Sequence, residues 1–338
     1  MAASLNWGII ATGGIARAFA QGVAHSKSGR VVAVGSRSLA SAERFAGEFG
    51  IPRAHGNYDA LLADPEVQAV YVATPHPQHV EWTIKAAGAG KHVLCEKPLS
   101  LTHAEALPAV EACRRHDVLL MEAFMYRCHP QTAKIVELVR SGALGRVALV
   151  QAAFGYAGRF DPTNRFWNKE LGGGGILDVG CYPVSFARLI AGAASGRPFA
   201  EPTAVCGAVQ LHPETGVDTC AAATLEFASG MIAQVSTSIV VTQDNSARIY
   251  GTEGWLHVPD PWIPARESGQ VRLRLHRGAE PVPEEITVET GDWLYGLEAD
   301  TFAAALAAGK REVPEMSPAD TLGNMAVLDA WRACAGGS

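Results

Sequence analysis

The stretch GIIATGGIA, residues 8–16, decides the first half of the fold. It joins the apolar run NWGII to the helical pattern GGIARAFAQGVA, and it fits the form G-x-G-x-x-G/A with Ala11, Gly13 and Ala16 in the three small-residue positions. Glycine turns between a strand and a helix also occur where no ligand binds, simply because the backbone must turn sharply. A glycine at position 13, however, lets a pyrophosphate approach the backbone amides at the start of the helix. The residues expected to bind the phosphates of a dinucleotide are Thr12, Gly13, Gly14 and Ile15.

Short apolar runs alternate with longer helical patterns up to about residue 125. The runs are NWGII, RVVAVGS, QAVYVAT, KHVLCE and VLLMEA. Each is apolar on both faces, as strands are when helices cover both sides of a parallel sheet. Right-handed crossovers then give a doubly wound sheet, so the sequence predicts an α/β protein in which residues 1–126 form a Rossmann dinucleotide-binding domain.

The rhythm changes after about residue 127. Helical patterns QTAKIVELVRSG and ILDVGCYPVSFARLIAG lie on either side of the strand RVALVQAAFGYAG, and then TAVCGAVQL, TCAAATLEF, MIAQVSTSIVV, ARIYGT and VRLRLH follow as strands. Two late helices end the chain, the second with Ser317 as N-cap and Pro318 at its first position. We expect residues 127–338 to form an α+β domain for substrate binding and oligomerisation, with helices on one face of an open, mostly antiparallel sheet.

Composition argues against several classes of partner. The net charge of -6 and the lack of a Lys/Arg-dense segment give no general attraction to nucleic acid or anionic lipid. No apolar run reaches the ~20 residues that span a bilayer, and MAASLNWGII lacks the features of a secretory leader. The seven cysteines form an odd set without C-x-x-C spacing, which favours reduced thiols. We expect a cytoplasmic protein with no nucleic-acid or membrane partner.

The end of the second strand bears on which dinucleotide is bound. About 20 residues beyond the glycine turn, an acidic residue ordinarily holds the ribose 2′-hydroxyl of NAD. This chain has Ser36, Arg37 and Ser38 there and no acid. Hydroxyl groups and a guanidinium suit a 2′-phosphate, although an arginine at a helix start is also commonly a solvated surface group. We predict NADP as the cofactor, with NAD as the alternative.

The stretch LCEKPLSL, residues 94–101, ends a buried strand with an acid, a base and a proline. In an open parallel sheet, ligands bind outside the carboxyl ends of the strands, near the switch in strand order. Glu96 and Lys97 would therefore open into the crevice where a nicotinamide bound at Gly13 lies, and a cis bond before Pro98 would aim Lys97 inward. Without that context, a lysine after a strand is usually a solvated surface group.

Several motifs together make nearly the whole chain similar to the Gfo/Idh/MocA oxidoreductases. They are GIIATGGIA, VYVATPHPQH, CEKP, LGGGGILDVGCYPV and GTEGWLHV. Within that family, ATPHPQH, MEA and HPETGVD most resemble stretches of the dimeric trans-dihydrodiol dehydrogenases and NADP-dependent D-xylose 1-dehydrogenases. The resemblance implies hydride transfer between NADP and a CH–OH group of a sugar, polyol or dihydrodiol, and a homodimer formed through the C-terminal sheet.

The resemblance also assigns roles to residues. It implies that Lys97 is catalytic with Tyr182 as its partner. Asp178 lies four residues before Tyr182, on the same helical face, and we expect it to be the third catalytic residue. A phenol beside a lysine charge is a useful acid or base near neutral pH, and which of the two groups carries the proton stays open. The cofactor-binding residues implied in addition to those above are Thr74, Pro75, His76, His79, Glu96 and Lys97.

Two further sets of side chains bear on ligands. His76 and His79 have H-x-x-H spacing, but no other ligands complete a zinc cluster, so no metal is expected. Aromatic faces are good platforms for sugar rings or dihydrodiols, although any one such side chain is more often part of the core. The residues expected to wall the substrate pocket are Phe154, Arg159, Phe166, Trp167 and Trp255.

Two other functions remain open from the residues. A non-catalytic NADP-sensing regulator or scaffold on the same fold is the main alternative, and the joint presence of Lys97 and Tyr182 argues against it. A methyltransferase with a glycine-rich turn is a poorer alternative, because it usually has an acid where Ser36 and Arg37 stand. The sequence leaves the exact substrate and the direction of the reaction undetermined.

Overall fold

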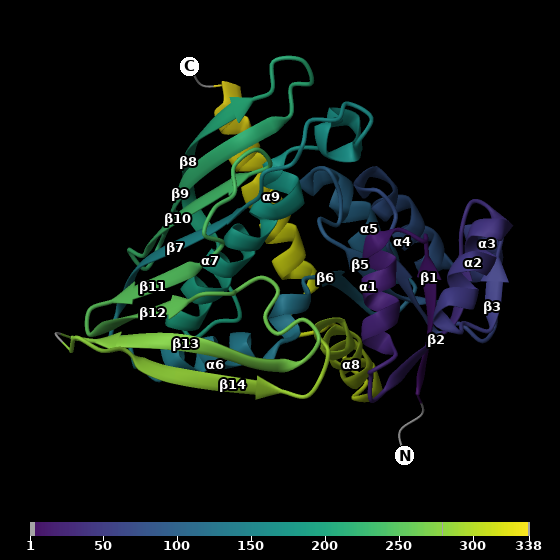
Figure 1. Ribbon diagram of the computed structural model, residues 1–338, viewed down its shortest axis with the longest axis horizontal. Coiled ribbons are helices and arrows are strands. Elements are labelled where there is room, and N and C mark those ends of the chain that lie inside the picture. Colours follow the sequence, from purple (N-terminus) through teal and green to yellow (C-terminus); the bar gives the residue numbers. More distant parts are fainter. Residues whose placement is uncertain (1–3, 279, 337–338) are drawn as a thin grey trace. The chain divides into compact units, whose positions relative to one another are not determined.

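The computed structural model describes residues 4–278 and 280–336, and they form two compact units (Figure 1). The first unit contains the chain up to His129 together with Ala265–Ser268 and Gly291–Thr321, and the second contains Pro130–Pro264, Gly269–Thr290 and the chain from Leu322 onward. The sequence led us to expect two continuous domains that meet at residue 126. In the structure, the first unit also contains two later segments of the chain.

The first unit holds a six-stranded parallel sheet in the order β3-β2-β1-β4-β5-β6. Its strands are β1 (Leu5–Ile10), β2 (Gly29–Gly35), β3 (Arg53–His55), β4 (Ala69–Val72), β5 (His92–Glu96) and β6 (Leu120–Ala123). Every residue of β4 and β6 is buried, as strands covered on both faces require. The predicted Rossmann doubly wound sheet is confirmed, and β3 is a short addition with no apolar run to indicate it.

Helices pack on both faces of this sheet. They are α1 (Gly14–Val23), α2 (Leu39–Phe49), α3 (Tyr58–Leu62), α4 (His79–Gly88), α5 (His103–Arg115) and α8 (Leu294–Ala307), with the short 3₁₀ helices η1 (His76–Gln78) and η2 (Met125–Cys128). α4 packs with α5, and α1 packs with α8. Side-chain caps set two of the starts: Asn57 accepts the Ala60 N–H at 2.7 Å, and Thr102 accepts the Glu105 N–H at 3.2 Å.

β1 and β4 are neighbours at the centre of the sheet, and the chain leaves them in opposite directions. β1 leads through α1 to β2, whereas β4 leads through α4 to β5. This is the switch in strand order beside which open parallel sheets bind ligands, just beyond the carboxyl ends of the strands. The turns after Ile10 and Val72 both open there.

The late helix α8 brings an acid into the core of the first unit. Glu298 on α8 is fully buried, and neither of its carboxyl oxygens has a hydrogen-bond partner among the described residues. Burial, followed by the charge of Glu96, raises the pKa of Glu298 well above its usual range. Glu298 therefore keeps its proton at pH values where an ordinary glutamate has lost it.

The second unit holds an eight-stranded sheet in the order β14-β13-β12-β11-β7-β10-β9-β8. Its strands are β7 (Val147–Gly155), β8 (Pro202–Leu211), β9 (Asp218–Phe227), β10 (Ile232–Ser238), β11 (Ala247–Gly251), β12 (Gly254–Val258), β13 (Gly269–Arg277) and β14 (Glu284–Thr290). β7 and β10 run parallel, and the other neighbouring strands run antiparallel. The predicted open, mostly antiparallel sheet is confirmed.

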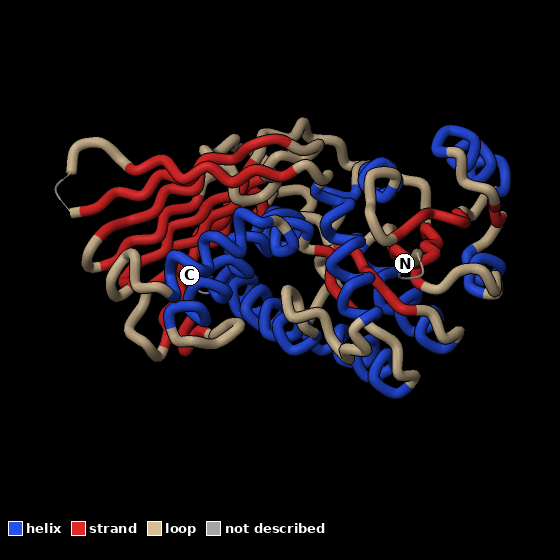
Figure 2. Tube along the Cα trace, turned by 90° about the horizontal axis from the view of Figure 1, so that it is seen from below, coloured by secondary structure: helices blue, strands red, loops and turns tan. Residues whose placement is uncertain are grey.

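The helices of the second unit lie on one side of this sheet (Figure 2). They are α6 (Pro130–Arg140), α7 (Cys181–Ala194) and the greater part of α9 (Pro318–Ala333), which Ser317 caps by accepting the Asp320 N–H at 3.3 Å. Strand residues alternate accordingly: on β13, Val271 and Leu273 are buried, whereas Arg272 between them is exposed. The other face of the sheet is left without helices in the described part of the chain.

α7 is the core helix of the second unit, and its residues Cys181 to Ala193 are all buried. The segment Lys169–Ala194 is long and apolar enough to cross a membrane by length and composition, but its most apolar window lies wholly inside the protein. Core helices of globular proteins have the same property. Just before α7, residues Ile176–Gly180 wind as a π-helix (η5), and Pro183 in the first turn of α7 lacks an N–H for the helical ladder.

Replacing Glu298 with glutamine should remove part of the pH dependence of folding. A group whose pKa is raised in the folded state stabilises that state below its unfolded pKa, near 4.5, and this contribution is lost as the pH rises toward the folded pKa. Wild type should therefore lose up to about 1.4 kcal/mol per pH unit relative to Glu298→Gln across this window. Denaturant unfolding of both proteins from pH 4 to 8 measures the difference, and Glu43→Gln at an exposed site on α2 should keep the wild-type profile. Parallel curves for wild type and Glu298→Gln would contradict the assignment.

Candidate active site

The glycine turn of the first unit forms an uncapped helix start. Gly13 is the N-cap of α1 without a side-chain hydrogen bond, and the first turn of α1 has no acid. A Cβ atom at Gly13 or Gly14 would meet nothing within 4 Å, so the backbone amides face open space between half-buried Thr12 and Ile15. Ala11 has a φ of 87°, a left-handed conformation that costs alanine about 1–2 kcal/mol. The residues fit a bound pyrophosphate.

The end of β2 presents the three residues expected to select the dinucleotide. Ser36 is buried and its N–H donates to the His55 carbonyl at 3.0 Å, whereas Arg37 and Ser38 are exposed. Ser38 is the N-cap of α2, but its hydroxyl makes no capping bond. Arg37 lies near Tyr58: burial raises the pKa of Tyr58 and the charge of Arg37 opposes that rise. The hydroxyl of Ser38 and the guanidinium of Arg37 thus remain directed to solvent rather than to the fold.

The segment after β4 combines an open residue with buried ones. Pro75 is exposed, whereas Thr74 and His76 are buried, and the Thr74 hydroxyl has no partner among the described residues. His79 is fully buried, with Nδ1 2.8 Å from the Pro98 carbonyl oxygen and Nε2 2.8 Å from that of Thr74. His79 therefore joins the segment after β4 to the segment after β5.

Two buried carboxylates hold the segment that contains Lys97. Glu96 accepts the Lys97 N–H at 3.2 Å and the Tyr71 hydroxyl, and Glu122 at the end of β6 accepts the Leu99 N–H at 2.9 Å. The Lys97–Pro98 bond is cis, as the sequence indicated, and Lys97 is half-buried. This arrangement keeps the lysine at the carboxyl edge of the sheet, next to the strand that opens into the switch in strand order.

In the second unit, Asp218 fixes the glycine run 172–175. Its carboxylate accepts the Ile176 N–H at 2.6 Å, and burial raises the pKa of Asp218 to about 6 even though these backbone amides oppose the rise. Gly174 has a φ of 106°, and a Cβ there would lie 2.1 Å from Asp218 Oδ1. A Cβ at Gly173 would lie 2.6 Å from the Phe166 carbonyl oxygen. The glycines are required because the run packs directly against Asp218 and the backbone at 165–168.

Asp178, in η5, is held by two donors. The Tyr156 hydroxyl donates to Asp178 Oδ2 at 2.8 Å, and Arg165 Nη2 lies 3.2 Å from Oδ1. Burial, followed by the Asp178 charge, raises the pKa of Tyr156 far above its usual range, so its hydroxyl stays protonated and donates. Both carboxylate oxygens are thereby fixed in direction.

Tyr182 is the second residue of α7, and its side chain is buried beside aromatic side chains. Its ring centroid is 5.3 Å from that of Phe154 and 6.0 Å from that of Trp262. Trp262 is itself fixed, because its indole N–H donates to the Ala153 carbonyl at 2.8 Å. Phe154 therefore packs directly against Tyr182 in this aromatic cluster.

Three other expected wall residues gather elsewhere in the second unit. Arg159, Phe166 and Trp167 line one pocket of about 520 Å³, together with Tyr156 and Phe160. Because Tyr156 also binds Asp178, this pocket is one side chain away from the Asp178 carboxylate.

Trp255 does not join the other expected wall residues. It stacks on His276 with centroids 3.8 Å apart and on Tyr250 at 5.5 Å. Its neighbours Leu256 and Val258 are buried against the helices, so alternation puts Trp255 on the helix-free face of the sheet. Phe154 lies on the opposite face, where it contacts α7.

The sequence alone does not single out four side chains that contact Asp178, the glycine run or Tyr182. Tyr156 and Arg165 reach Asp178 across 22 and 13 residues, and Asp218 reaches Ile176 across 42. Trp262 lies in a proline-rich turn, PDPWIP, that looks like a surface connection. The run LGGGG offered one usable signal, because consecutive glycines imply a close approach by some other group.

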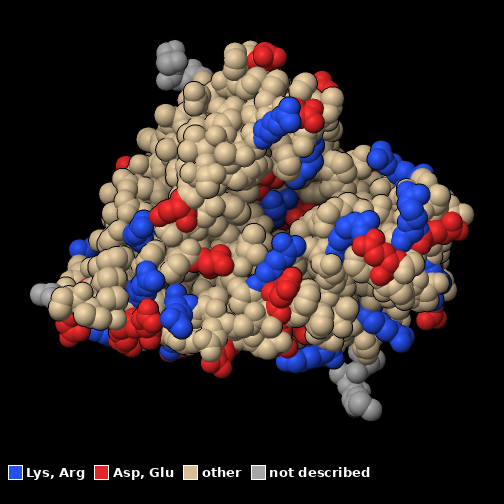
Figure 3. All heavy atoms as spheres, in the orientation of Figure 1, with Lys and Arg blue, Asp and Glu red and all other residues tan. Residues whose placement is uncertain are grey.

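Charge and metal ligands give no further site. Lys and Arg atoms are interspersed with Asp and Glu atoms over the face shown in Figure 3, without a broad patch of one sign. Among the described residues, no group of three or more His, Cys, Asp or Glu side chains could hold a metal ion. The first unit therefore offers a glycine turn suited to a dinucleotide and the nearby Lys97. The second unit offers Tyr182 and the oriented carboxylate of Asp178.

Two protein-family models match the chain. Residues 5–124 match an oxidoreductase family with an NAD-binding Rossmann fold, and residues 132–257 match the GFO/IDH/MocA C-terminal domain. The trans-1,2-dihydrobenzene-1,2-diol dehydrogenase of Danio rerio is 35% identical over 340 residues, which cover 97% of this chain and 96% of that protein. The D-xylose 1-dehydrogenase (NADP(+)) 2 of Haloferax volcanii is 34% identical over 324 residues, with 96% and 95% covered.

Solved structures share the architecture of the chain. A 3-ketoreductase from Actinomadura kijaniata, in complex with TDP-benzene and NADP, superposes with a TM-score of 0.85 at 27% identity over 98% of both chains. The aldose-aldose oxidoreductase from Caulobacter crescentus, complexed with glycerol, superposes with a TM-score of 0.87 at 28% identity over 98% of this chain and 97% of that one.

Proposed function

The chain belongs to the Gfo/Idh/MocA family of oxidoreductases, and on that basis we propose that it transfers hydride between NADP and a CH–OH group of a sugar, polyol or dihydrodiol. The observation that carries the proposal is the placement of Lys97. It is half-buried at the carboxyl edge of the parallel sheet, and the backbone around it is held by Glu96 and Glu122. A lysine kept in this position is suited to act on a ligand at the switch in strand order.

Tyr182 is the proposed proton carrier. A bound nicotinamide supplies the hydride acceptor or donor, and the substrate hydroxyl must then lose or gain a proton. The phenol of Tyr182 takes that proton more readily when a cation favours its phenolate form, and the ammonium group of Lys97 supplies such a charge. Lys97 also stabilises negative charge on the substrate oxygen. Exchange of the two roles would leave the same residues essential.

The names of the relatives support the substrate class. One relative is a D-xylose 1-dehydrogenase (NADP(+)) and another acts as a trans-1,2-dihydrobenzene-1,2-diol dehydrogenase. Both names denote substrates with neighbouring oxygen-bearing carbons. Phe154, beside Tyr182, is the proposed wall for the reacting part of such substrates. Arg159, Phe166 and Trp167 line the nearby pocket, where they are proposed to contact the part of the substrate that extends beyond the reacting group.

NADP is the proposed cofactor, with NAD as the weaker one. Arg37 and Ser38 stand exposed at the end of β2, and no acid is present there to hold a ribose 2′-hydroxyl. A guanidinium can bind a 2′-phosphate through two parallel hydrogen bonds.

Lys97→Met and Tyr182→Phe should each lower kcat/KM by about 10²–10⁴-fold, because each removes a group that handles the proton or the charge of the substrate oxygen. The measurement is absorbance of NADPH with a panel of aldoses, polyols and trans-dihydrodiols. Fluorescence titration with NADPH should show that Tyr182→Phe still binds the cofactor.

The outcome distinguishes the proposal from its alternative. Near-normal turnover in both variants would refute the assignment of Lys97 and Tyr182. NADPH binding by wild type without turnover of any member of the panel would favour a non-catalytic NADP-sensing protein.

Arg37→Ala should raise KM for NADP by about 10–100-fold and leave KM for NAD nearly unchanged, because only NADP carries the 2′-phosphate. Initial rates with each cofactor measure the two constants. Arg30→Ala is the matched control, since Arg30 lies at the other end of β2, where its side chain donates to Asn6. An equal effect of Arg37→Ala on both cofactors would remove the basis for the NADP preference.

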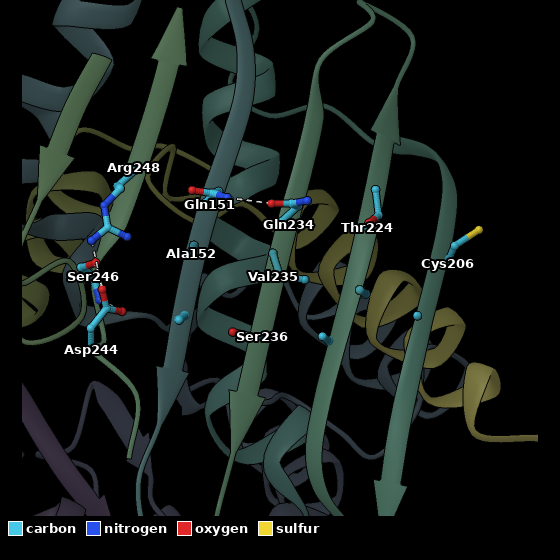
Figure 4. A pocket seen from close by; sticks show the side chains of 14 residues that line it. Gln151, Ala152, Cys206, Thr224, Gln234, Val235, Ser236, Asp244, Ser246 and Arg248 are labelled. Atoms are coloured by element: carbon cyan, nitrogen blue, oxygen red, sulfur yellow. Dashed lines mark hydrogen bonds and ion pairs between the residues drawn. The ribbon is translucent and has the colours of Figure 1, made fainter. Parts of the chain in front are cut away.

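We also propose that a second copy of the chain covers the helix-free face of the second sheet. Gln151, Thr224 and Gln234 project from the middle of this face (Figure 4), where Gln151 donates to Gln234 at 2.7 Å. Strands β8, β9 and β10 carry only two charged residues, Asp218 and Glu226, and the surface over them in Figure 3 is almost free of charged atoms. A sheet face of this size with so little charge is suited to self-association.

The double substitution Thr224→Lys and Gln234→Lys should dissociate the dimer, because it buries like charges across a symmetric interface. Light scattering after gel filtration should give twice the 35.6 kDa chain mass for wild type and for Glu43→Lys, and a mass near 35.6 kDa for the double variant. A monomeric wild type would refute the proposed homodimer.

A cytoplasmic location is part of the same proposal. All seven cysteines are free thiols, which suits a reducing compartment. Fractionation of cells that express the chain tests this location directly.

A further inference from the structure

A pocket of about 520 Å³ in the second unit is separate from the proposed reacting groups. Neither Asp178 nor Tyr182 lines it. The connection runs through Tyr156, which lines the pocket and donates its hydroxyl to Asp178 at 2.8 Å. A ring that reacts beside Asp178 would therefore not fill this pocket, but a group attached to that ring would lie next to it.

The walls of the pocket are aromatic and fixed. Trp167 is buried, and its indole N–H donates to the Arg159 carbonyl at 3.1 Å. Phe160 packs against Trp167 in a T-shaped contact with centroids 5.0 Å apart, and Phe166 makes a similar contact with Tyr156 at 6.1 Å. These contacts hold four aromatic side chains around one volume, which residues within 158–167 form together with Tyr156 and Ile239.

Polar side chains line the same pocket, and part of their hydrogen-bonding capacity is not used within the protein. Asp161 uses Oδ1 to accept from the backbone and hydroxyl of Thr163, and Asn164 uses Oδ1 to accept from the Phe166 N–H. The guanidinium of Arg159, the amide nitrogen of Asn164 and the second oxygen of Asp161 have no partner among the described residues. Donors and acceptors of both kinds are thus available beside aromatic surfaces.

We propose that this pocket is a subsite for a second glycosyl ring. Aromatic faces bind the apolar C–H faces of a sugar, and planar amide, carboxylate and guanidinium groups bind its hydroxyls. The substrate class is then a disaccharide or longer glycoside, with the reacting ring at Asp178 and Tyr182 and the next ring beyond Tyr156. The position of the reacting ring rests on the proposed function, whereas the binding of the second ring does not.

Paired substrates test the subsite in the active enzyme. Wild type with NADP should have a kcat/KM about tenfold higher for cellobiose than for D-glucose, or for xylobiose than for D-xylose. Phe160→Ala and Arg159→Gln should each lower the ratio of disaccharide to monosaccharide kcat/KM by about tenfold. Arg146→Gln, at an exposed site before β7, is the matched control and should keep the wild-type ratio.

Binding separates failure of the subsite from failure of the proposed function. Calorimetric titration of cellobiose and D-glucose into Tyr182→Phe with NADP present requires no turnover. Tighter binding of cellobiose that Phe160→Ala or Arg159→Gln abolishes supports the subsite, even if no sugar is turned over and the proposed reaction is wrong. Cellobiose and xylobiose that bind no more tightly than their monosaccharides, or an affinity that neither substitution changes, overturns it.

Discussion

The site depends on one constraint: backbone N–H groups at the ends of buried elements need acceptors where water does not reach. Acidic side chains from distant strands meet that need in both units. Glu122 on β6 takes the Leu99 N–H beyond β5, and Asp218 at the start of β9 takes the Ile176 N–H at the start of η5. The same bonds hold the backbone near Lys97 and Tyr182, because Leu99 follows Lys97 by two residues and Ile176 precedes Tyr182 in the same helical segment. The hydrogen bonds that satisfy these buried amides therefore also position the backbone that carries the two proposed catalytic side chains.

Much of the first unit follows from sequence, because its signals are local. Apolar runs alternating with helical patterns determine a doubly wound sheet, and Gly13 marks the strand–helix turn that becomes the dinucleotide cradle. β3 escapes such reasoning, since three residues without an apolar run carry no period. The return of residues 291–321 to the first unit also has no local signal, because α8 is simply apolar and any apolar helix can pack on any core.

The second unit shows the limit more sharply. Its alternating strands predict an open sheet, yet the partners of Asp178 come from a loop that sequence periodicity does not describe. Trp255 shows a different limit of sequence interpretation. An aromatic residue suggests a wall of a ligand pocket, but its buried neighbours Leu256 and Val258 already place Trp255 on the helix-free face of the sheet. Reading the alternation of β12 residue by residue would have separated it from Phe154. The type of a residue suggests a role, but the direction of its side chain determines whether the residue can reach the ligand.

The orientation of Trp255 makes it an intrinsic fluorescent probe of the helix-free face. Trp262 and Trp331 are buried, and Trp167 lies in the loop that precedes α7, so Trp255 is the tryptophan of the second unit that lies on the helix-free face. Its indole ring is stacked on the imidazole of His276, with ring centroids 3.8 Å apart. The fluorescence spectrum of the unlabelled protein would therefore carry a component sensitive to whatever covers that surface.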